Sequence, residues 1–503
     1  MTLNNSNNKN FLLYIRKVET IKLVVEFINM EFEKQEDAIF SPASPGAQYL
    51  NSSALSLMVV AVMESEVPID ESLIVPHLKD VIMPLNPRFS SIMVVGEDGL
   101  RKWKQVDVEF EDHIIIPKLP TEKSIEFWDK YVTGYISNIS MEPLSQNRPL
   151  WEVHLVKQTT SYAAGTIIFK LHHALGDGYT LMGVVLSGLQ RVDNPILPLT
   201  FPSRETKPLN GPNTHNFLRN TPRYIKRFMY TLSDFGWGVL RSKLMEDDLT
   251  PIRSGDDGVE FRPRVVNTMS FPLDSIKQIK DKLNVTINDV ITGIIMMGTR
   301  MYMQDEEKES SYANSTALVL LNTRTVGGYK SVSDMLKPKT NTPWGNHFAF
   351  LHIPLPEFTN SEWSNPLNFV IKAHQIIKKK RDSASVLLTG KFLDALRTLR
   401  GPEATAEYIH STLKNSSMAI SNMIGPLDQM ALAGHPIKGL YFFVAGAPQS
   451  LSVLIMSYMG YLRVAISVEK DFIDPNKFKL CMNKAFQMIY REAVGTSPLT
   501  KSI

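Results

Sequence analysis

Between residues 165 and 173 the side chains alternate between two faces, as they do on a β-strand. Gly176 and Gly178 follow, and their backbone freedom predicts a tight turn. Residues 180–189 then repeat apolar side chains at helical spacing, and Asp177 stands where an acid would cap that helix. The pattern therefore predicts a strand, a glycine turn and a capped helix. One face of the strand carries Ile167, Phe169, Leu171 and His173, and the other carries Ile168, Lys170 and His172.

The second half of the chain mixes the same two periodicities. A helix is expected over residues 286–303, opened by Asn288 or Asp289. Because strands and helices mix in both halves, the fold class is predicted to be α/β or α+β. Further strands are expected at 317–325, 347–355 and 461–470, and further helices at 369–380 and 475–492.

A length of 503 residues is more than one ordinary domain needs, and it suggests two or three. A proline-rich and polar stretch at 194–216 reads as a linker or crossover. The first ten residues are rich in asparagine, which is typical of disorder. We therefore expect a disordered extension at 1–35, an N-terminal domain at 36–193, a crossover at 194–265 and a C-terminal domain at 266–495.

Within the crossover, aromatic and apolar side chains recur at helical spacing from Tyr224 onward, and four cations flank them with no acid among them. Such a basic amphipathic helix could lie on an anionic membrane surface. It could equally pack across the domain junction. The four cations are Arg219, Arg223, Lys226 and Arg227.

Composition excludes several classes of protein. A formal net charge of +3 does not mark a nucleic-acid binder. The single cysteine, Cys481, excludes an intrachain disulfide framework and is expected to be an ordinary packed residue. The apolar runs, such as 54–63, are too short to span a bilayer.

The histidine pair at 172 and 173 is the strongest candidate for chemistry. Neighbouring residues on a strand point to opposite faces, so His172 and His173 are not placed to share a metal ion, and no metal is predicted. The chain also lacks G-x-S-x-G and a Walker loop. One histidine acting as a general base on an alcohol remains. Asp177 is expected to brace the loop, with Arg324 as its partner.

These residues resemble the wax ester synthase/diacylglycerol acyltransferase family, within the coenzyme-A-dependent acyltransferases. "HHALGDG" (172–178) resembles the active-site signature, and "MEPLSQNRPLWEVHLV" (141–156) the segment before it. "TINDV" (286–290), "WGNHFAFLHIPL" (344–355) and "SNMIGPLDQMALAGHPI" (421–437) resemble landmarks of the second domain. The resemblance covers about residues 40–493.

The resemblance implies two chloramphenicol-acetyltransferase-like domains with an active-site tunnel at their interface. It places His173 at the catalytic base, while His172, Gly176, Asp177 and Gly178 would shape the loop. A fatty acyl group would pass from acyl-CoA, a co-substrate and not a cofactor, to a long-chain alcohol or diacylglycerol. The oxyanion needs a hydrogen-bond donor, for which Asn288 is a candidate, although it could instead be a simple helix cap. Plant members imply the cytosolic face of the endoplasmic reticulum, and the plasma membrane as a further location.

Two other functions stay open at this point. "DFGWG" (234–238), together with the HHxxxDG motif, imitates the two signatures of plant BAHD acyltransferases, which acylate small soluble alcohols and amines. In that family the second signature comes late in the second domain, whereas here Phe235 belongs to the apolar stripe of the crossover helix. The other alternative is a lipid-binding protein without catalysis, against which the intact HHxxxDG motif argues.

Overall fold

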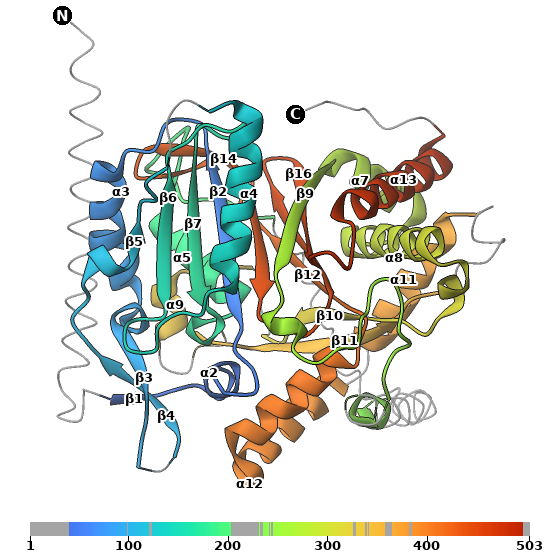
Figure 1. The fold of residues 1–503 in the computed structure, drawn as a ribbon, viewed down its shortest axis with the longest axis horizontal. Helices are drawn as coiled ribbons and strands as arrows, with labels where there is room; N and C mark the ends of the chain where they lie inside the picture. Colours follow the sequence, from blue (N-terminus) through green and yellow to red (C-terminus); the bar gives the residue numbers. More distant parts are fainter. Residues whose placement is uncertain are drawn as a thin grey trace, which may run out of the picture.

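The structure is a computed structural model in which the described residues form two β-sheets with helices packed on both (Figure 1). Among these residues, no helix is both long enough and apolar enough to cross a membrane. The expected extension at 1–35 and the four crossover cations lie outside the described part. The described residues are 40–97, 99–119, 123–202, 231, 235–240, 242, 245–324, 328–337, 340, 342–357, 365–381 and 385–495.

The first sheet has seven strands in the order β5-β6-β7-β2-β14-β13-β8. Its centre is antiparallel, with β2 paired to β7 on one side and to β14 on the other. The apolar run at 54–63, too short for a bilayer, supplies most of β2, and every residue of this strand except Ala61 is buried. The strands are β5 Ile114–Ile115, β6 Trp151–Val156, β7 Gly165–His172, β2 Met58–Ser65, β14 His435–Ala445, β13 Met430–Leu432 and β8 Gln190–Arg191.

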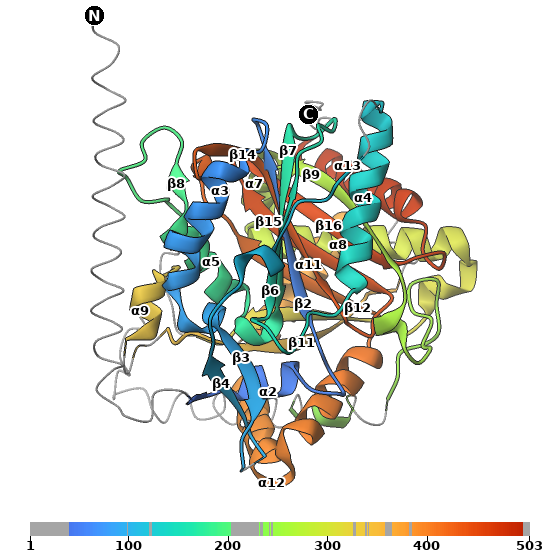
Figure 2. The same ribbon diagram turned by 60° about the vertical axis from the view of Figure 1, so that its left-hand side comes forward.

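Helices cover the two faces of this sheet (Figures 1 and 2). Helix α5 (Gly178–Gly188) lies over the face that carries Ala61, and α4 (Ile125–Met141) lies over the opposite face, which carries Val62. A small three-stranded sheet, β1-β4-β3, borders them. Its strands are Phe40–Pro42, Arg101–Gln105 and Ser91–Val95, and the nearby helices are α2 (Pro45–Leu50), α3 (Glu71–His77) and a π-helical turn at Leu78–Ile82.

The second sheet has six strands in the order β11-β10-β12-β15-β16-β9. Helices α7, α8, α11 and α13 gather beside it in Figure 1, and their apolar side chains share one core with the sheet. The strands are β9 Arg264–Pro272, β10 Thr316–Asn322, β11 Phe348–Pro354, β12 Met418–Ile424, β15 Leu451–Tyr458 and β16 Tyr461–Glu469. The helices of this half are α7 Leu273–Leu283, α8 Ile287–Glu306, α9 Val332–Leu336, α11 Leu367–Arg381, α12 Ser385–Lys414 and α13 Pro475–Val494, of which α9 packs in the core of the first sheet.

The C-terminal part of the chain does not stay within the second sheet. Met430–Leu432 and His435–Ala445 cross back and pair in the first sheet, where β14 lies beside β2. Two strands of the expected C-terminal domain at 266–495 therefore belong to the sheet of the N-terminal half. This exchange joins the two halves through backbone hydrogen bonds, and it places Ala445 level with His172, with Met58 of β2 between them.

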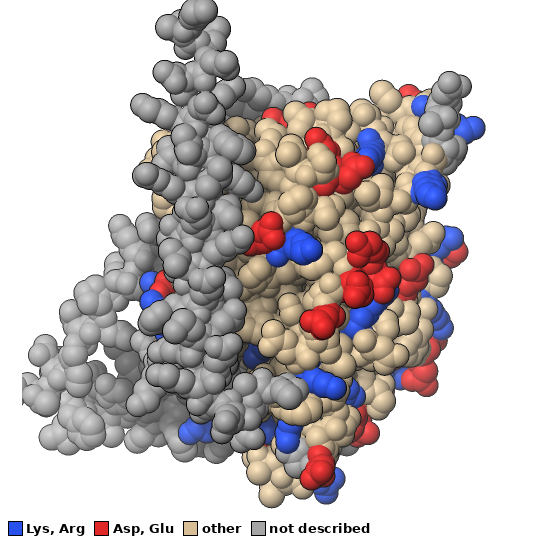
Figure 3. Space-filling view, turned by 90° about the vertical axis from the view of Figure 1, so that its left-hand side faces the viewer, with Lys and Arg blue, Asp and Glu red and all other residues tan. Residues whose placement is uncertain are grey.

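The mixed α/β class predicted from sequence is confirmed, and the strongly periodic elements appear where they were expected. The helix predicted at 286–303 is α8, and its cap is Thr286, whose side chain accepts from the backbone N–H of Asp289 while Asp289 caps in return. Asn288 is therefore not the helix cap. Basic and acidic side chains lie interspersed on the face shown in Figure 3, in keeping with the small net charge of +3.

Candidate active site

His173 lies directly after β7, in a short 3-10 turn at His173–Leu175. Its backbone N–H donates to the Leu57 carbonyl at 2.8 Å, which fixes it beside β2. Its ring nitrogen Nδ1 lies 2.9 Å from Asn346 Oδ1, and Asn346 Nδ2 donates to the His173 carbonyl at 2.8 Å. His173 is only 6% exposed. Asn346, which belongs to the second half of the chain, therefore holds both the ring and the backbone of a buried residue.

The Asn346 contacts decide which ring nitrogen of His173 is basic. Because Asn346 Nδ2 donates to a carbonyl, Oδ1 is the acceptor that faces the ring, and Nδ1 must carry the proton. The other nitrogen, Nε2, then holds a lone pair. Burial lowers the pKa of His173 below its ordinary value, while Asp177 opposes that shift. The imidazole is therefore neutral and basic at physiological pH.

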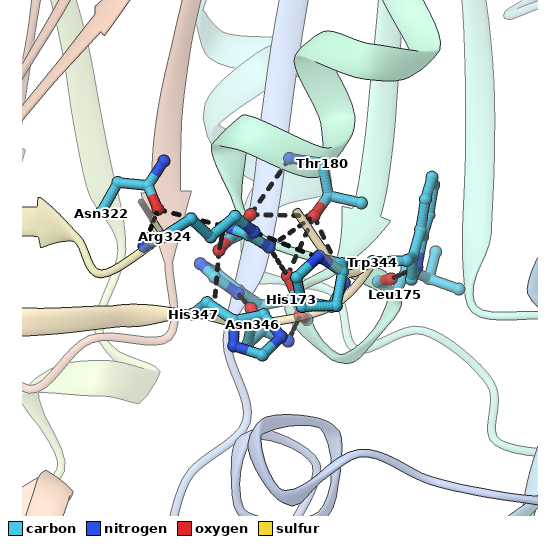
Figure 4. A network of polar contacts seen from close by, with 11 residues as sticks. His173, Leu175, Thr180, Asn322, Arg324, Trp344, Asn346 and His347 are labelled. Atoms are coloured by element: carbon cyan, nitrogen blue, oxygen red, sulfur yellow. Dashed lines mark hydrogen bonds and ion pairs between the residues drawn. The ribbon is translucent and has the colours of Figure 1, made fainter. Parts of the chain in front are cut away.

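Asp177 is the centre of a buried network that joins the two halves of the chain, and Figure 4 shows its partners Thr180, Arg324 and His347 close together. Its Oδ1 accepts from the backbone N–H of Thr180 at 3.0 Å and from the Thr180 hydroxyl at 2.9 Å, which makes Asp177 the cap of α5. Its Oδ2 accepts from Arg324 at 2.7 Å and from the backbone N–H of His347 at 2.8 Å. Both the predicted capping role and the predicted partner, Arg324, are present.

Arg324 extends this network to the segment that carries Asn346. It donates to the Gly345 carbonyl at 2.7 Å and to the Pro343 carbonyl at 3.1 Å. It also lies over the Tyr179 ring, 4.8 Å from the centroid. The guanidinium thus ties residues 343–347 to the HHxxxDG loop, and this places Asn346 against His173.

His172 has a different environment from His173. Its Nδ1 accepts from the Ala174 backbone N–H at 3.1 Å, so Nε2 carries the proton and donates to the Ser56 hydroxyl at 3.0 Å. Burial, with help from His173, lowers the pKa of His172 to about 3. His172 is thus a neutral residue that supports the turn and points away from the cavity face.

The two glycines of the loop allow close packing. A Cβ atom at Gly178 would lie 2.3 Å from Met423 Sδ, and one at Gly176 would lie 2.8 Å from Thr180 Cγ2. Gly176 has an extended backbone with φ 166°, so the expected need for unusual backbone freedom does not apply to it. At Gly176 the crowding atoms belong to the short Thr180 side chain, whereas at Gly178 they belong to the flexible end of Met423, which would have to shift to admit a side chain.

His173 opens onto a cavity of about 220 Å³ whose lining is almost entirely apolar. The cavity runs between the first sheet and α5 on one side and the second sheet on the other. Such a cavity suits a hydrocarbon substrate better than a small polar one. The polar residues at its wall, besides His173 and Asp177, are Asn322, Ser421, Asn422, Gln449 and Ser452.

Asn288 reaches this wall only through a neighbour. Its Oδ1 accepts from Asn422 Nδ2 at 3.2 Å, and Asn422 lines the cavity. Asn346 is the site residue that sequence reasoning missed, although its segment at 344–355 had been singled out. Nothing in the local sequence marks it, because its partner lies 173 positions away.

Three further predictions concern metal binding, Cys481 and Phe235. Among the described residues, no group of three or more His, Cys, Asp or Glu side chains is placed to hold a metal ion. Cys481 is buried, as expected of a packed residue. Phe235, from the BAHD-like "DFGWG", packs against Phe392 with ring centroids 6.1 Å apart, as expected for a packing residue.

His172→Ala tests the supporting role of the first histidine. The variant leaves the buried Ala174 N–H without its acceptor, a loss of about 1–3 kcal/mol, but keeps the His173 ring and its Asn346 partner. We expect a lower melting temperature and a rate reduced by roughly tenfold. Thermal unfolding and ester formation measured on the same preparation check this, and a loss of rate as large as that of His173→Ala would contradict it.

Comparisons with known proteins agree with this geometry. Residues 101–291 match the wax ester synthase/diacylglycerol acyltransferase catalytic domain, and residues 344–490 match the WS/DGAT C-terminal domain. The chain is 30% identical over 487 residues to wax ester synthase/diacylglycerol acyltransferase 5 of Arabidopsis thaliana, covering 90% of this chain and 92% of the relative. It is 27% identical to wax ester synthase/diacylglycerol acyltransferase 4 of the same plant, covering 88% of this chain and 88% of the relative.

Solved structures show the same fold. The wax ester synthase/diacylglycerol acyltransferase from Marinobacter aquaeolei VT8 superposes with a TM-score of 0.56 at 15% identity, over 90% of this chain and all of that one. The first condensation domain of the calcium-dependent antibiotic synthetase gives a TM-score of 0.53 at 10% identity, over 90% and 94%. With a curated relative 30% identical over nine tenths of its length, the chain belongs to the wax ester synthase/diacylglycerol acyltransferase family and is an acyltransferase.

Proposed function

We propose that the protein transfers a fatty acyl group from acyl-CoA to a long-chain alcohol, giving a wax ester, or to diacylglycerol, giving triacylglycerol. The observation that carries this proposal is His173: its Nδ1 is held by Asn346, and its ring lies at the wall of an apolar cavity. Family membership supplies the substrate class. The cavity supplies the physical reason, since an apolar wall of this kind favours hydrocarbon chains.

The chemistry follows from the neutral imidazole. The acceptor hydroxyl gives its proton to His173 Nε2 while its oxygen attacks the thioester carbonyl carbon. The tetrahedral intermediate then collapses, the C–S bond breaks, and the CoA thiolate takes the proton from the imidazolium. The reaction needs no oxidant or further reactant, and both substrates must be bound together.

The oxyanion of that intermediate requires a hydrogen-bond donor. In this proposal the donor is Asn288. Asn288 does not itself line the cavity: Asn422 lies at the wall and donates its Nδ2 to Asn288 Oδ1 at 3.2 Å, so Asn288 Nδ2 has to reach the oxyanion beside Asn422. Asp177 does not touch the substrate in this scheme. It acts through Arg324 and residues 343–347 as a positioning residue.

One incubation tests the proposed function. Purified protein receives palmitoyl-CoA with an equal mixture of hexadecanol and diacylglycerol, and the lipids are separated afterwards. We expect wax ester, triacylglycerol or both, together with free CoA in equal amount. The proposal is wrong if a folded preparation releases no CoA and forms neither lipid, while acylating a small soluble alcohol.

We further propose that the protein works at a membrane surface, on the cytosolic face of the endoplasmic reticulum, since its substrates reside in membranes. The support is the basic segment that contains Arg223, Lys226 and Arg227, which would favour anionic lipid by about 1 kcal/mol per cation. Replacing all three with glutamate is expected to abolish sedimentation with anionic liposomes while sparing activity on detergent-dispersed substrate. Unchanged liposome binding would show that this segment is not the anchor.

A further inference from the structure

Ala61 has an unusual environment for a residue in the middle of a sheet. Strand β2 is paired on both edges, and each of its residues is buried except Ala61, which is partly exposed. The neighbouring strands close off the edges, so the exposure must come from the face of the sheet. Ala61 lines the cavity that reaches His173. The sheet is therefore hollowed at this alanine.

The hollow is a furrow that follows β2. Alternate residues of a strand share one face, and Leu57, Val59, Ala61 and Met63 all line the cavity. In the register of the sheet, Ala61 lies between Phe169 of β7 and Phe442 of β14. We call this the β2 furrow, and it consists of Val59, Ala61, Met63, Phe169, Leu171, Leu440, Phe442 and Val444.

Helix α5 roofs the furrow, and the π-helical turn closes its far end. The helix begins at Gly178, beside the catalytic loop, and runs to Gly188. A Cβ atom at Gly188 would lie 2.0 Å from Ile82 Cδ1, so the helix and the turn are in direct contact there. Ile82, Met83 and Leu189 line the cavity at this end. A chain that enters past His173 therefore meets a wall near Met63.

The length of the furrow can be read from the strand. Leu57 is level with His173, because its carbonyl accepts the His173 N–H. Met63 lies six positions after Leu57, and a strand rises about 3.3 Å per residue, so the furrow is about 20 Å long. With C–C bonds of about 1.5 Å, an extended alkyl chain advances about 1.25 Å per carbon. About 16 carbons fit.

We propose that the β2 furrow holds one linear alkyl chain of about 16 carbons, that Ala61 keeps it open along its length, and that the wall near Met63 sets its length limit. This inference rests on the proposed function. Each wall residue of the furrow is apolar, which suits a hydrocarbon tail. The space between Phe169 and Phe442 is only one alanine wide, so it suits an unbranched chain. The tail could come from the acyl group or from the alcohol, and the experiment separates the two.

Ala61→Phe tests the proposal. Ala61 lies four residues from Leu57, about 13 Å along the strand, so a phenyl ring there leaves room for about ten carbons. Each methylene that loses its place costs about fourfold in kcat/KM. We therefore expect the ratio of kcat/KM for C16 over C8 substrate to fall at least 100-fold, with C8 activity retained. Ala61→Leu gives the same direction with a smaller change in volume, should the phenylalanine variant not fold.

Two further variants give the experiment its controls. Val62→Phe adds similar bulk one residue along, but Val62 faces the other side of the sheet, toward the space of about 670 Å³ under α4. The C16 over C8 ratio is expected to stay unchanged in this variant, whatever the substitution does to stability. Met63→Ala removes the side chain at the far wall, and it is expected to move the preferred length upward by two to four carbons.

Two substrate series identify the tail. One varies the acyl-CoA from C8 to C20 with hexadecanol fixed, and the other varies the alcohol with palmitoyl-CoA fixed. A cut-off in the first series assigns the furrow to the acyl chain, and a cut-off in the second assigns it to the alcohol. Unchanged ratios for Ala61→Phe in both series would overturn the inference. If the unmodified protein forms no ester from any pair, the proposed function itself has failed.

Discussion

His173→Ala is expected to lower ester formation by about 10²–10⁴-fold, the range that a positioned general base contributes. The loss should fall on kcat, because the imidazole takes the proton in the transition state and adds little to substrate binding. The fold should persist, since the ring borders a cavity and its removal only enlarges that space. Ester formation from palmitoyl-CoA and hexadecanol, with circular dichroism on the same sample, measures both.

His172→Ala is the matched control. The two histidines are adjacent and both buried, but only His173 lines the cavity. A difference in rate of tenfold or more between the two variants is therefore expected. Purified His173→Ala protein that makes ester at the wild-type rate would show that this histidine is not the base.

Arg324→Leu is expected to have the largest effect on stability. The change leaves the Asp177 carboxylate buried without its charge partner, and breaking such a pair costs about 3–5 kcal/mol of the free energy of unfolding. It also releases the Gly345 carbonyl, so residues 343–347 lose their tie to the catalytic loop. Thermal or urea unfolding should show the loss, and activity should fall with it because Asn346 no longer holds the His173 ring.

Asp177→Ala, and the double variant that combines it with Arg324→Leu, complete this test. Asp177→Ala removes the α5 cap as well as the ion pair, so it should damage both stability and rate. Removing both charges should be less destabilising than the sum of the two single changes, because no unpaired charge remains. An unchanged melt of Asp177→Ala with a lost rate would contradict the bracing role and point to direct participation in the chemistry.

The elements around the catalytic loop could be predicted because their signals are local. The alternation at 165–173, the two glycines and Asp177 each report on residues within a few positions, and β7, the turn and α5 form there. That Asp177 pairs with a cation such as Arg324 could be predicted for another reason, because a buried carboxylate requires a partner. The contact between His173 and Asn346 is different: its partners are 173 positions apart and either could have bonded elsewhere.

The return of β14 to the first sheet and the β2 furrow also lay beyond the sequence. The strands β2 and β14 are apolar on both faces, so their pattern indicates burial without naming a neighbour. An alanine in such a run has the same appearance whether it packs against a side chain or faces a cavity. The hollow at Ala61 depends on how β7, β14 and α5 sit around it, which is a property of the assembled fold.

The most direct test of the account is the pH dependence of kcat/KM for the unmodified protein and for His173→Ala. Burial lowers the pKa of His173 from its ordinary value of 6.5, so the base stays deprotonated to a lower pH than free histidine does. The account predicts a fall on the acid side that is centred below pH 6.5 as one proton binds, and no such fall in the residual rate of His173→Ala. A fall centred above pH 7, or the same fall in both proteins, would contradict it.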